Sequence, residues 1–203
     1  MELREILKKE YVKTAILLAV VIIGVFAFWI GLTTALKTEY PMLAVASGSM
    51  EPALYKGDLI MVQGIADGGD VVVGRDVDDP PGDIIVFHSP RVRSELIVHR
   101  AIGSERRGGT WYFQTKGDAN SGADNWDGDW STDYDLAEEY VIGRVFGQVS
   151  TIGYIPLFLR EFLWTPVGMM LIVTLLLVFL FYDYLPLPWK KDRLDAPEPD
   201  KEI

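Results

Sequence analysis

Two long apolar runs constrain this chain more than any other feature of its sequence. Residues 14–36 and 162–182 contain no charged side chain, and a charged residue bounds each run on either side. An α-helix rises about 1.5 Å per residue, so each run can cross a hydrocarbon core of roughly 30 Å. Buried core helices of this length usually carry polar positions, and the apolar stretch of a cleaved signal peptide covers only about 7–15 residues. We therefore expect transmembrane helices over residues 14–36 and 162–184.

Basic residues beside the two runs predict how the chain lies in the membrane. The ones before the first run are Arg4, Lys8, Lys9 and Lys13, and the ones after the second are Lys190, Lys191 and Arg193. Lys and Arg concentrate on the cytoplasmic side of membrane helices. We expect a two-pass cell-membrane protein with residues 1–13 and 185–203 in the cytoplasm and residues 37–161 outside. Proline and charge dominate residues 185–203, which indicates a disordered tail.

The composition limits what the exported segment can do. The chain has 29 acidic and 19 basic side chains and a net charge of −10, and phosphate binding needs clustered Lys and Arg, so we expect no nucleic-acid partner. There is no cysteine, which excludes disulfides, Cys-ligated metals and a Cys nucleophile. The two histidines, His88 and His99, cannot form a three-His metal site. We expect neither a metal nor another cofactor.

Short β-rich runs separated by Gly, Pro and Asp fill the exported segment, and no long amphipathic helix is visible there. The expected strands cover residues 59–63, 71–73, 83–87, 96–102, 111–115 and 140–149. Several short strands at this spacing favour a small partial barrel or folded-over sheet. The fold class we expect is a mainly β exported domain with one N-terminal and one C-terminal transmembrane helix.

Three polar groups in the exported segment could carry chemistry. Ser49 lies in a Ser-Gly-Ser-Met turn, and a serine needs a base within hydrogen-bond reach to act as a nucleophile. His99 lies inside an apolar strand, where it could be a general base or a structural histidine with satisfied ring nitrogens. His88, at a strand end, is the rival base. An Asp from the turn after residue 116 would complete a Ser, His, Asp set for acyl transfer.

Five segments carry a resemblance to a known family. In sequence order they are Ser47-Gly48-Ser49-Met50-Glu51-Pro52, Lys56-Gly57-Asp58, Pro81-Gly82-Asp83-Ile84-Ile85-Val86-Phe87, Val98-His99-Arg100-Ala101-Ile102 and Lys116-Gly117-Asp118-Ala119-Asn120. They resemble the conserved boxes of signal peptidase I, over roughly residues 15–150. The histidine after Val98 is similar to the archaeal and endoplasmic-reticulum branch, because the bacterial branch has lysine there. The resemblance implies a signal-peptidase-like fold and a membrane-bound serine endopeptidase that cleaves N-terminal signal peptides from exported preproteins.

The resemblance also implies roles for individual residues. Ser49 matches the nucleophile and His99 the general base. The family's acidic residues map to Asp118 and Asp124, and we favour Asp124 as the acid of the triad and Asp118 as its support, with the choice between them open. Ser47 matches a position whose hydroxyl assists the oxyanion hole, and we place Met50 beside it in the oxyanion and substrate-binding set.

The same resemblance implies the partners. They are preproteins with signal peptides and the lipid bilayer, with the protein translocation channel as a further candidate. An alternative function is a non-catalytic, membrane-anchored β domain for assembly or adhesion, which would not need Ser49 close to His99. A self-cleaving repressor core also has a serine nucleophile and a similar sheet, but it is soluble, uses lysine as its base and carries a DNA-binding domain.

An acidic loop offers a separate alternative. The acidic residues and Ser131 within residues 127–138 have the spacing of the ligands in an EF-hand calcium loop. The sixth position, however, is Thr132 instead of glycine, and no flanking helices are evident. We expect a solvated loop here and no bound metal.

Overall fold

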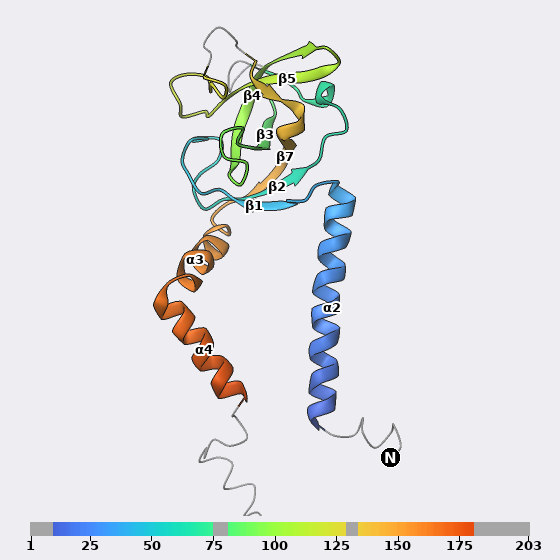
Figure 1. Cartoon of the computed structure of the whole chain (residues 1–203), viewed down its shortest axis with the longest axis vertical. Coiled ribbons are helices and arrows are strands. Elements are labelled where there is room, and N and C mark those ends of the chain that lie inside the picture. Colours follow the sequence, from blue (N-terminus) through green and yellow to red (C-terminus); the bar gives the residue numbers. More distant parts are fainter. Residues whose placement is uncertain (1–9, 75–80, 129–133, 181–203) are drawn as a thin grey trace, which may run out of the picture. The chain divides into compact units, whose positions relative to one another are not determined.

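The computed structural model describes residues 10–74, 81–128 and 134–180 (Figure 1). The chain divides into two compact units, Met1–Ile155 and Pro156–Ile203. The expected cytoplasmic tail, residues 185–203, and most of residues 1–13 lie outside the described residues. The predictions for these two segments therefore stay predictions.

The first described element of the first unit is the apolar helix α2, Glu10–Leu36. Its residues Val12–Leu36 are long and apolar enough to cross a membrane, and none of the apolar window is buried inside the protein. Lys37 ends the helix with a φ of 52°, and the Gly64 N–H donates to the Leu36 carbonyl at 2.8 Å. A Cβ on Gly64 would lie 2.0 Å from the Lys37 carbonyl oxygen, so this contact requires glycine. The predicted N-terminal membrane anchor is confirmed, and its helix begins earlier than residue 14.

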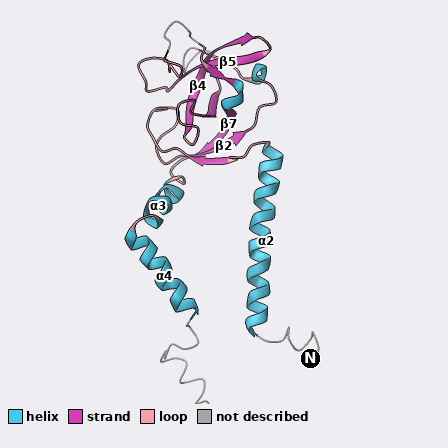
Figure 2. Cartoon of the chain, viewed as in Figure 1, coloured by secondary structure: helices cyan, strands magenta, loops and turns pink. Residues whose placement is uncertain are grey.

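After α2 the first unit contains one antiparallel sheet with the strand order β1-β2-β7-β3-β4-β5-β6, and Figure 2 shows its strands gathered together in magenta. The strands are β1 Met42–Ala44, β2 Leu59–Gln63, β3 Ile84–His88, β4 Leu96–Arg107, β5 Thr110–Lys116, β6 Leu136–Ala137 and β7 Val141–Val149. Two short 3-10 helices, η1 Gly68–Asp70 and η2 Glu138–Tyr140, precede the loop to β3 and strand β7. The result is an antiparallel half-barrel, so the mainly β prediction is confirmed.

Three details of the strand prediction differ from the structure. Residues 71–73 form no strand: the Val72 N–H donates to a carboxylate oxygen of Asp83 at 2.9 Å, so a side chain takes the place of a ladder partner. Strands β1 and β6 are only three and two residues long and were not predicted. Strand β4 runs past residue 102 to Arg107, with a register shift between Ala101 and Gly103.

Strand β3 is buried on both faces and joins the two halves of the core. Successive side chains of a strand point to opposite faces, so Val86 packs into one cluster and Ile85 and Phe87 into the other. The first cluster also contains Val45, Met50, Leu54, Ile60 and Val62, and the second contains Val71, Ala101, Phe113 and Leu136. This double burial explains the uninterrupted apolar run from Ile84 to Phe87.

The C-terminal apolar run is broken into two helices, α3 Tyr154–Leu163 and α4 Pro166–Leu180, bent by 88°. The single helix predicted from residue 162 is therefore wrong at its start. Thr165 caps α4 by accepting from the Gly168 N–H at 3.0 Å. Pro166 occupies the first helical position, where its missing N–H has no cost. By length and composition the pair counts as a span only if both helices form one bent span; residues 181–184 lie outside the described residues.

Candidate active site

Ser49 lies in the loop after β1, in a turn that its neighbours hold in place. Met50 and Leu54 are each 1% exposed and anchor the turn in the first core cluster. The Leu54 N–H donates to the Met50 carbonyl at 2.9 Å, and the Ala119 N–H donates to the Ser49 carbonyl at 2.9 Å. The Ser49 hydroxyl is therefore presented from a backbone that is fixed on both sides.

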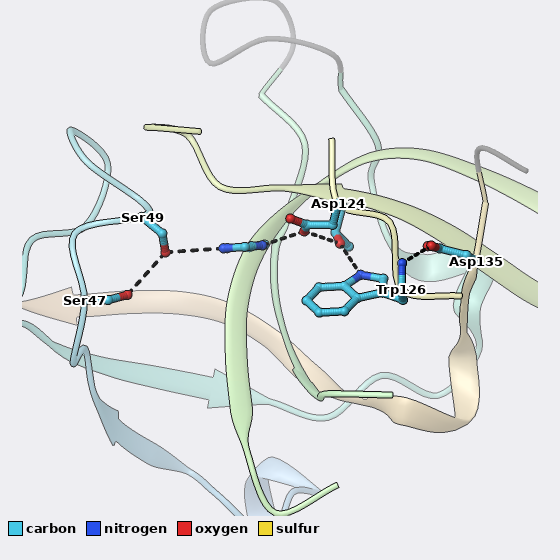
Figure 3. A network of polar contacts seen from close by, with 7 residues as sticks. Ser47, Ser49, Asp124, Trp126 and Asp135 are labelled. Atoms are coloured by element: carbon cyan, nitrogen blue, oxygen red, sulfur yellow. Dashed lines mark hydrogen bonds and ion pairs between the residues drawn. The ribbon is translucent and has the colours of Figure 1, made fainter. Parts of the chain in front are cut away.

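His99 reaches Ser49 from strand β4. Its Nε2 lies 3.3 Å from Ser49 Oγ, and its Nδ1 lies 2.6 Å from Asp124 Oδ2. His99 is 7% exposed, and its ring meets Phe87 edge to face with the centroids 6.4 Å apart. Figure 3 follows the polar contacts from Ser47 and Ser49 through Asp124 to Trp126 and Asp135. The structure thus brings together a serine, a histidine and an aspartate in the order that acyl transfer needs.

Asp118 is placed differently from Asp124. Both of its carboxylate oxygens accept hydrogen bonds from Arg100, at 2.8 Å from Nε and 2.7 Å from Nη2. The two side chains are only 7% and 3% exposed, and Arg100 also donates to the Gly82 carbonyl at 2.6 Å. Arg100 follows His99 in β4, and the turn that carries Asp118 also carries Ala119, which bonds the Ser49 carbonyl. Asp118 therefore binds Arg100 beside the site and does not bind His99.

An open cleft of about 300 Å³ leads to Ser49 and His99. Its lining comes from β1 and the loop after it and from the start of β4, and includes Leu43, Val45, Met50, Leu96 and Val98. Strand β1 is an edge of the sheet, because it pairs with β2 only. An edge strand has free backbone groups that an extended peptide can pair with. The cleft can therefore take an extended, largely apolar peptide.

The remaining predicted residues also have defined places. Ser47 Oγ lies 3.3 Å from Ser49 Oγ, and Met50 is part of the lining of the cleft. His88, the rival base, forms a hydrogen bond from its Nδ1 to the Arg93 carbonyl at 2.8 Å, and its ring meets the Tyr40 ring edge to face. Neither contact of His88 involves Ser49. The geometry therefore favours His99 over His88 as the partner of the serine.

Asp135, which follows the acidic loop after Asp124, takes part in this network. Asp135 accepts hydrogen bonds from the backbone N–H groups of Trp126 and Asp127. Desolvation by burial raises the pKa of the Asp135 carboxyl, and the two backbone bonds oppose that rise. Residues 129–133, which hold three of the six ligand positions of the alternative calcium loop, lie outside the described residues. Over the residues that are described, no three His, Asp or Glu side chains are grouped to hold a metal ion.

Comparison with known proteins agrees with this geometry. The model of the family described as "Signal peptidase, peptidase S26" matches residues 9–105. A signal peptidase complex catalytic subunit SEC11 from Tuber melanosporum is 30% identical over 189 residues, which is 87% of this chain and 94% of that protein. The chain belongs to the signal peptidase family. The SEC11 subunits of Colletotrichum graminicola and Metarhizium robertsii are 30% and 31% identical, each over 79% of this chain and 87% of their own length.

Family membership bears on the earlier predictions in three ways. The resemblance to signal peptidases is confirmed, and the non-catalytic alternative loses its support. These relatives are fungal, so they do not support the archaeal part of the prediction. The stretch that matches the family model contains Ser49 and His99 and ends before Asp118 and Asp124. The choice of the acidic residue therefore depends on the structure.

The sequence did not reveal Arg100, Thr115 and Trp126 as parts of the site. Arg100 binds Asp118, while Thr115 and Trp126 lie behind Asp124. The β-rich run over residues 111–115 predicted that Thr115 lies in a strand, but it could not tell that the hydroxyl points to Asp124. Trp126 falls in a stretch with no periodicity, where no sequence signal indicates its partner.

Proposed function

We propose that this signal peptidase cleaves N-terminal signal peptides from exported preproteins with Ser49 as nucleophile, His99 as general base and Asp124 as the acid of the triad. One observation carries the proposal: His99 lies between Ser49 Oγ at 3.3 Å and Asp124 Oδ2 at 2.6 Å, at the end of a cleft. A hydroxyl, an imidazole and a carboxylate in that order form the arrangement that activates a serine for acyl transfer.

The reaction follows from these positions. Ser49 Oγ attacks the scissile carbonyl while His99 Nε2 takes its proton, and the imidazolium then protonates the leaving amine. Asp124 stabilises the imidazolium through Nδ1. The developing oxyanion is stabilised by the Ser49 backbone N–H and by the Ser47 hydroxyl, with Met50 shaping the cleft beside them. Water then attacks the acyl-enzyme with His99 as the base, which releases the signal peptide and restores Ser49.

The shape of the cleft supports an extended substrate. A signal peptide segment that pairs with the edge of β1 would present its carbonyl to Ser49 in a fixed register. Leu43, Val45 and Val98 make the lining apolar, and the volume of about 300 Å³ suits small side chains near the scissile bond. Specificity would then come from backbone pairing together with the limited size of the cleft.

The membrane placement completes the proposal. Helix α2 anchors the protein, and the basic residues before it favour an N-terminus in the cytoplasm and residues 37–161 outside. The apolar composition of α3 and α4 supports a second crossing as one bent span, with the C-terminus also in the cytoplasm. The relatives are named catalytic subunits of a signal peptidase complex. This suggests that the present chain also works with partner subunits, beside preproteins, the bilayer and the translocation channel.

Processing of a labelled preprotein by the detergent-solubilised full chain tests this function. We expect a single cut between signal peptide and mature protein, located by the masses of both products. Ser49→Ala, purified in the same way, is the matched control and should give no product. A wild-type preparation that leaves several preproteins intact, or cleavage elsewhere in them, would contradict the proposal.

A further inference from the structure

A hydrogen-bonded chain continues behind Asp124, on the far side from Ser49 (Figure 3). The Thr115 hydroxyl lies 2.7 Å from Asp124 Oδ2, and Trp126 Nε1 lies 3.1 Å from the Thr115 hydroxyl. Thr115 is fully buried in β5, and its carbonyl accepts a bond from the Asp124 backbone N–H at 2.8 Å. Thr115 therefore bonds both the main chain and the carboxylate of Asp124.

The Trp126 indole N–H, at the far end, fixes the direction of the hydrogen bonds in this series. The indole N–H of Trp126 can only donate, so the Thr115 hydroxyl accepts there. That hydroxyl has a single hydrogen, which is left to point at Asp124. An ionised carboxylate only accepts, so Asp124 Oδ2 accepts from Thr115 and also from the Nδ1–H of His99.

This direction has a consequence at the reacting end. With a hydrogen on Nδ1, a neutral His99 has a bare lone pair on Nε2, the atom that faces Ser49 Oγ at 3.3 Å. The other tautomer would place the Nδ1 lone pair against a carboxylate oxygen that has no hydrogen to offer. The tautomer set through Asp124 is thus the one a general base requires.

We propose that Thr115 and Trp126 are positioning residues that hold the Asp124 carboxylate against Nδ1 of His99, where the ionised carboxylate keeps His99 in the tautomer with a bare Nε2. The inference rests on the proposed function, because it assigns the two residues to that triad. Neither side chain is proposed to touch the substrate. Their effect passes entirely through Asp124.

The surroundings hold Trp126 in the orientation that this role needs. Its ring meets Phe87 edge to face with the centroids 5.4 Å apart, and Phe87 also contacts the His99 ring. The Trp126 backbone N–H donates to the Asp135 carboxylate, and Arg91 donates to the Asn125 carbonyl at 2.5 Å. The indole is therefore fixed by contacts that are independent of Thr115.

Three substitutions separate the hydroxyl from the shape of the side chain. Thr115→Val keeps the shape and removes the hydroxyl, Thr115→Ser keeps the hydroxyl, and Trp126→Phe keeps a ring but removes the N–H. A hydrogen bond to a charged group supports a loss of about tenfold or more in kcat for Thr115→Val, with KM little changed. Thr115→Ser should stay within about threefold of wild type, and Trp126→Phe should fall between the two. Adding Trp126→Phe to Thr115→Val should cost little more, because the chain is already interrupted.

Two readouts distinguish this role from simple structural support. The pH profile of the rate should change in Thr115→Val, because the hydroxyl no longer bonds the carboxylate that faces the imidazole. Nitrogen-15 spectra of the histidine rings in the solubilised full chain should show a hydrogen on Nδ1 of His99 in wild type and a mixture of tautomers in Thr115→Val. His88 is the other histidine in the chain and serves as the internal reference.

The outcomes are separable. If wild type processes preprotein, Ser49→Ala does not, and Thr115→Val has the wild-type rate, pH profile and tautomer, the positioning role is overturned while the proposed function stands. If Ser49→Ala still processes preprotein, the proposed function fails, and the spectra still decide whether Thr115 sets the tautomer. Should Thr115→Val fail to fold, Trp126→Phe is measured in its place, and a wild-type tautomer and pH profile there would overturn the role.

Discussion

Arg100 binds both carboxylate oxygens of Asp118, at 2.8 and 2.7 Å, in a position where the two side chains are 7% and 3% exposed. A buried ion pair with this geometry is costly to break from one side, because the remaining charge is left without a partner. Asp124, in contrast, accepts from His99. The two aspartates beside the site therefore have different chemical tasks.

We expect Asp118→Asn and Asp124→Asn to fail in different ways. Asp118→Asn should lower the free energy of unfolding by about 3–5 kcal/mol, because Arg100 keeps a buried, unpaired charge. Asp124→Asn should leave stability nearly unchanged and lower kcat by about 10⁴, because the wrong histidine tautomer is favoured. Thermal unfolding and processing rates of both variants check this. The double variant Arg100→Gln/Asp118→Asn should recover part of the lost stability, and equal effects of the two single variants on kcat and stability would contradict the distinction.

The two histidines form a matched pair for the general base. His99→Ala should lower the processing rate by about 10²–10⁴, because the serine loses its proton acceptor. His88→Ala should keep most of the activity, since His88 bonds the Arg93 carbonyl and does not contact Ser49. Initial rates with saturating preprotein measure both variants. Complete loss in His88→Ala together with a retained fold would require a reassignment of the base.

The bend at Thr165 and Pro166 makes the C-terminal topology a sharp prediction. If α3 and α4 act as one bent span, a tag at the C-terminus faces the cytoplasm. Protease added to right-side-out vesicles should then leave the tag intact and digest a tag placed within residues 37–161. Digestion of the C-terminal tag in sealed vesicles would mean that α3 and α4 lie against the membrane without crossing it.

Asp135 makes stability depend on pH in a defined direction. Burial raises the pKa of its carboxyl above 3.8, so the folded protein holds this proton more tightly than the unfolded chain does. This stabilisation is complete at pH values below the pKa that Asp135 has in the unfolded chain. It is lost as the pH rises through the pKa that Asp135 has in the folded protein. The melting temperature of wild type should therefore fall relative to that of Asp135→Asn as pH increases from about 3.8. A difference that is constant, or that grows in favour of wild type, would refute this reading of Asp135.

Much of the fold follows from local patterns, and its exceptions have physical causes. Turn residues and apolar runs predicted β2, β3, β5 and β7 to within a residue or two of their observed ends. Strands β1 and β6 were not predicted, because two or three residues are too few to form a recognisable β-rich run. The helix start at Pro166 lies inside the predicted span, because that span was drawn from the run of uncharged residues and hydropathy alone cannot report a bend.

Some residues of the site could also be predicted from the sequence, and others could not. Ser49 and His99 could be proposed from short segments, because each lies in a recognisable local context. The choice between Asp118 and Asp124 could not, since both lie in the short segment after β5 and only the three-dimensional structure separates the Arg100 contact from the His99 contact. Thr115 and Trp126 were hidden for a related reason: a buried hydroxyl and an indole become informative only once their partners are known.

The most direct test of the account is to locate the covalent intermediate. A signal peptide whose scissile bond is an ester should acylate the enzyme faster than water releases it, so acid quenching in the burst phase should trap the acyl-enzyme. The account predicts that peptide mapping by mass spectrometry finds the acyl group on Ser49 and that Ser49→Ala shows neither burst nor adduct. An adduct on any other residue, or wild-type turnover by Ser49→Ala, would contradict it.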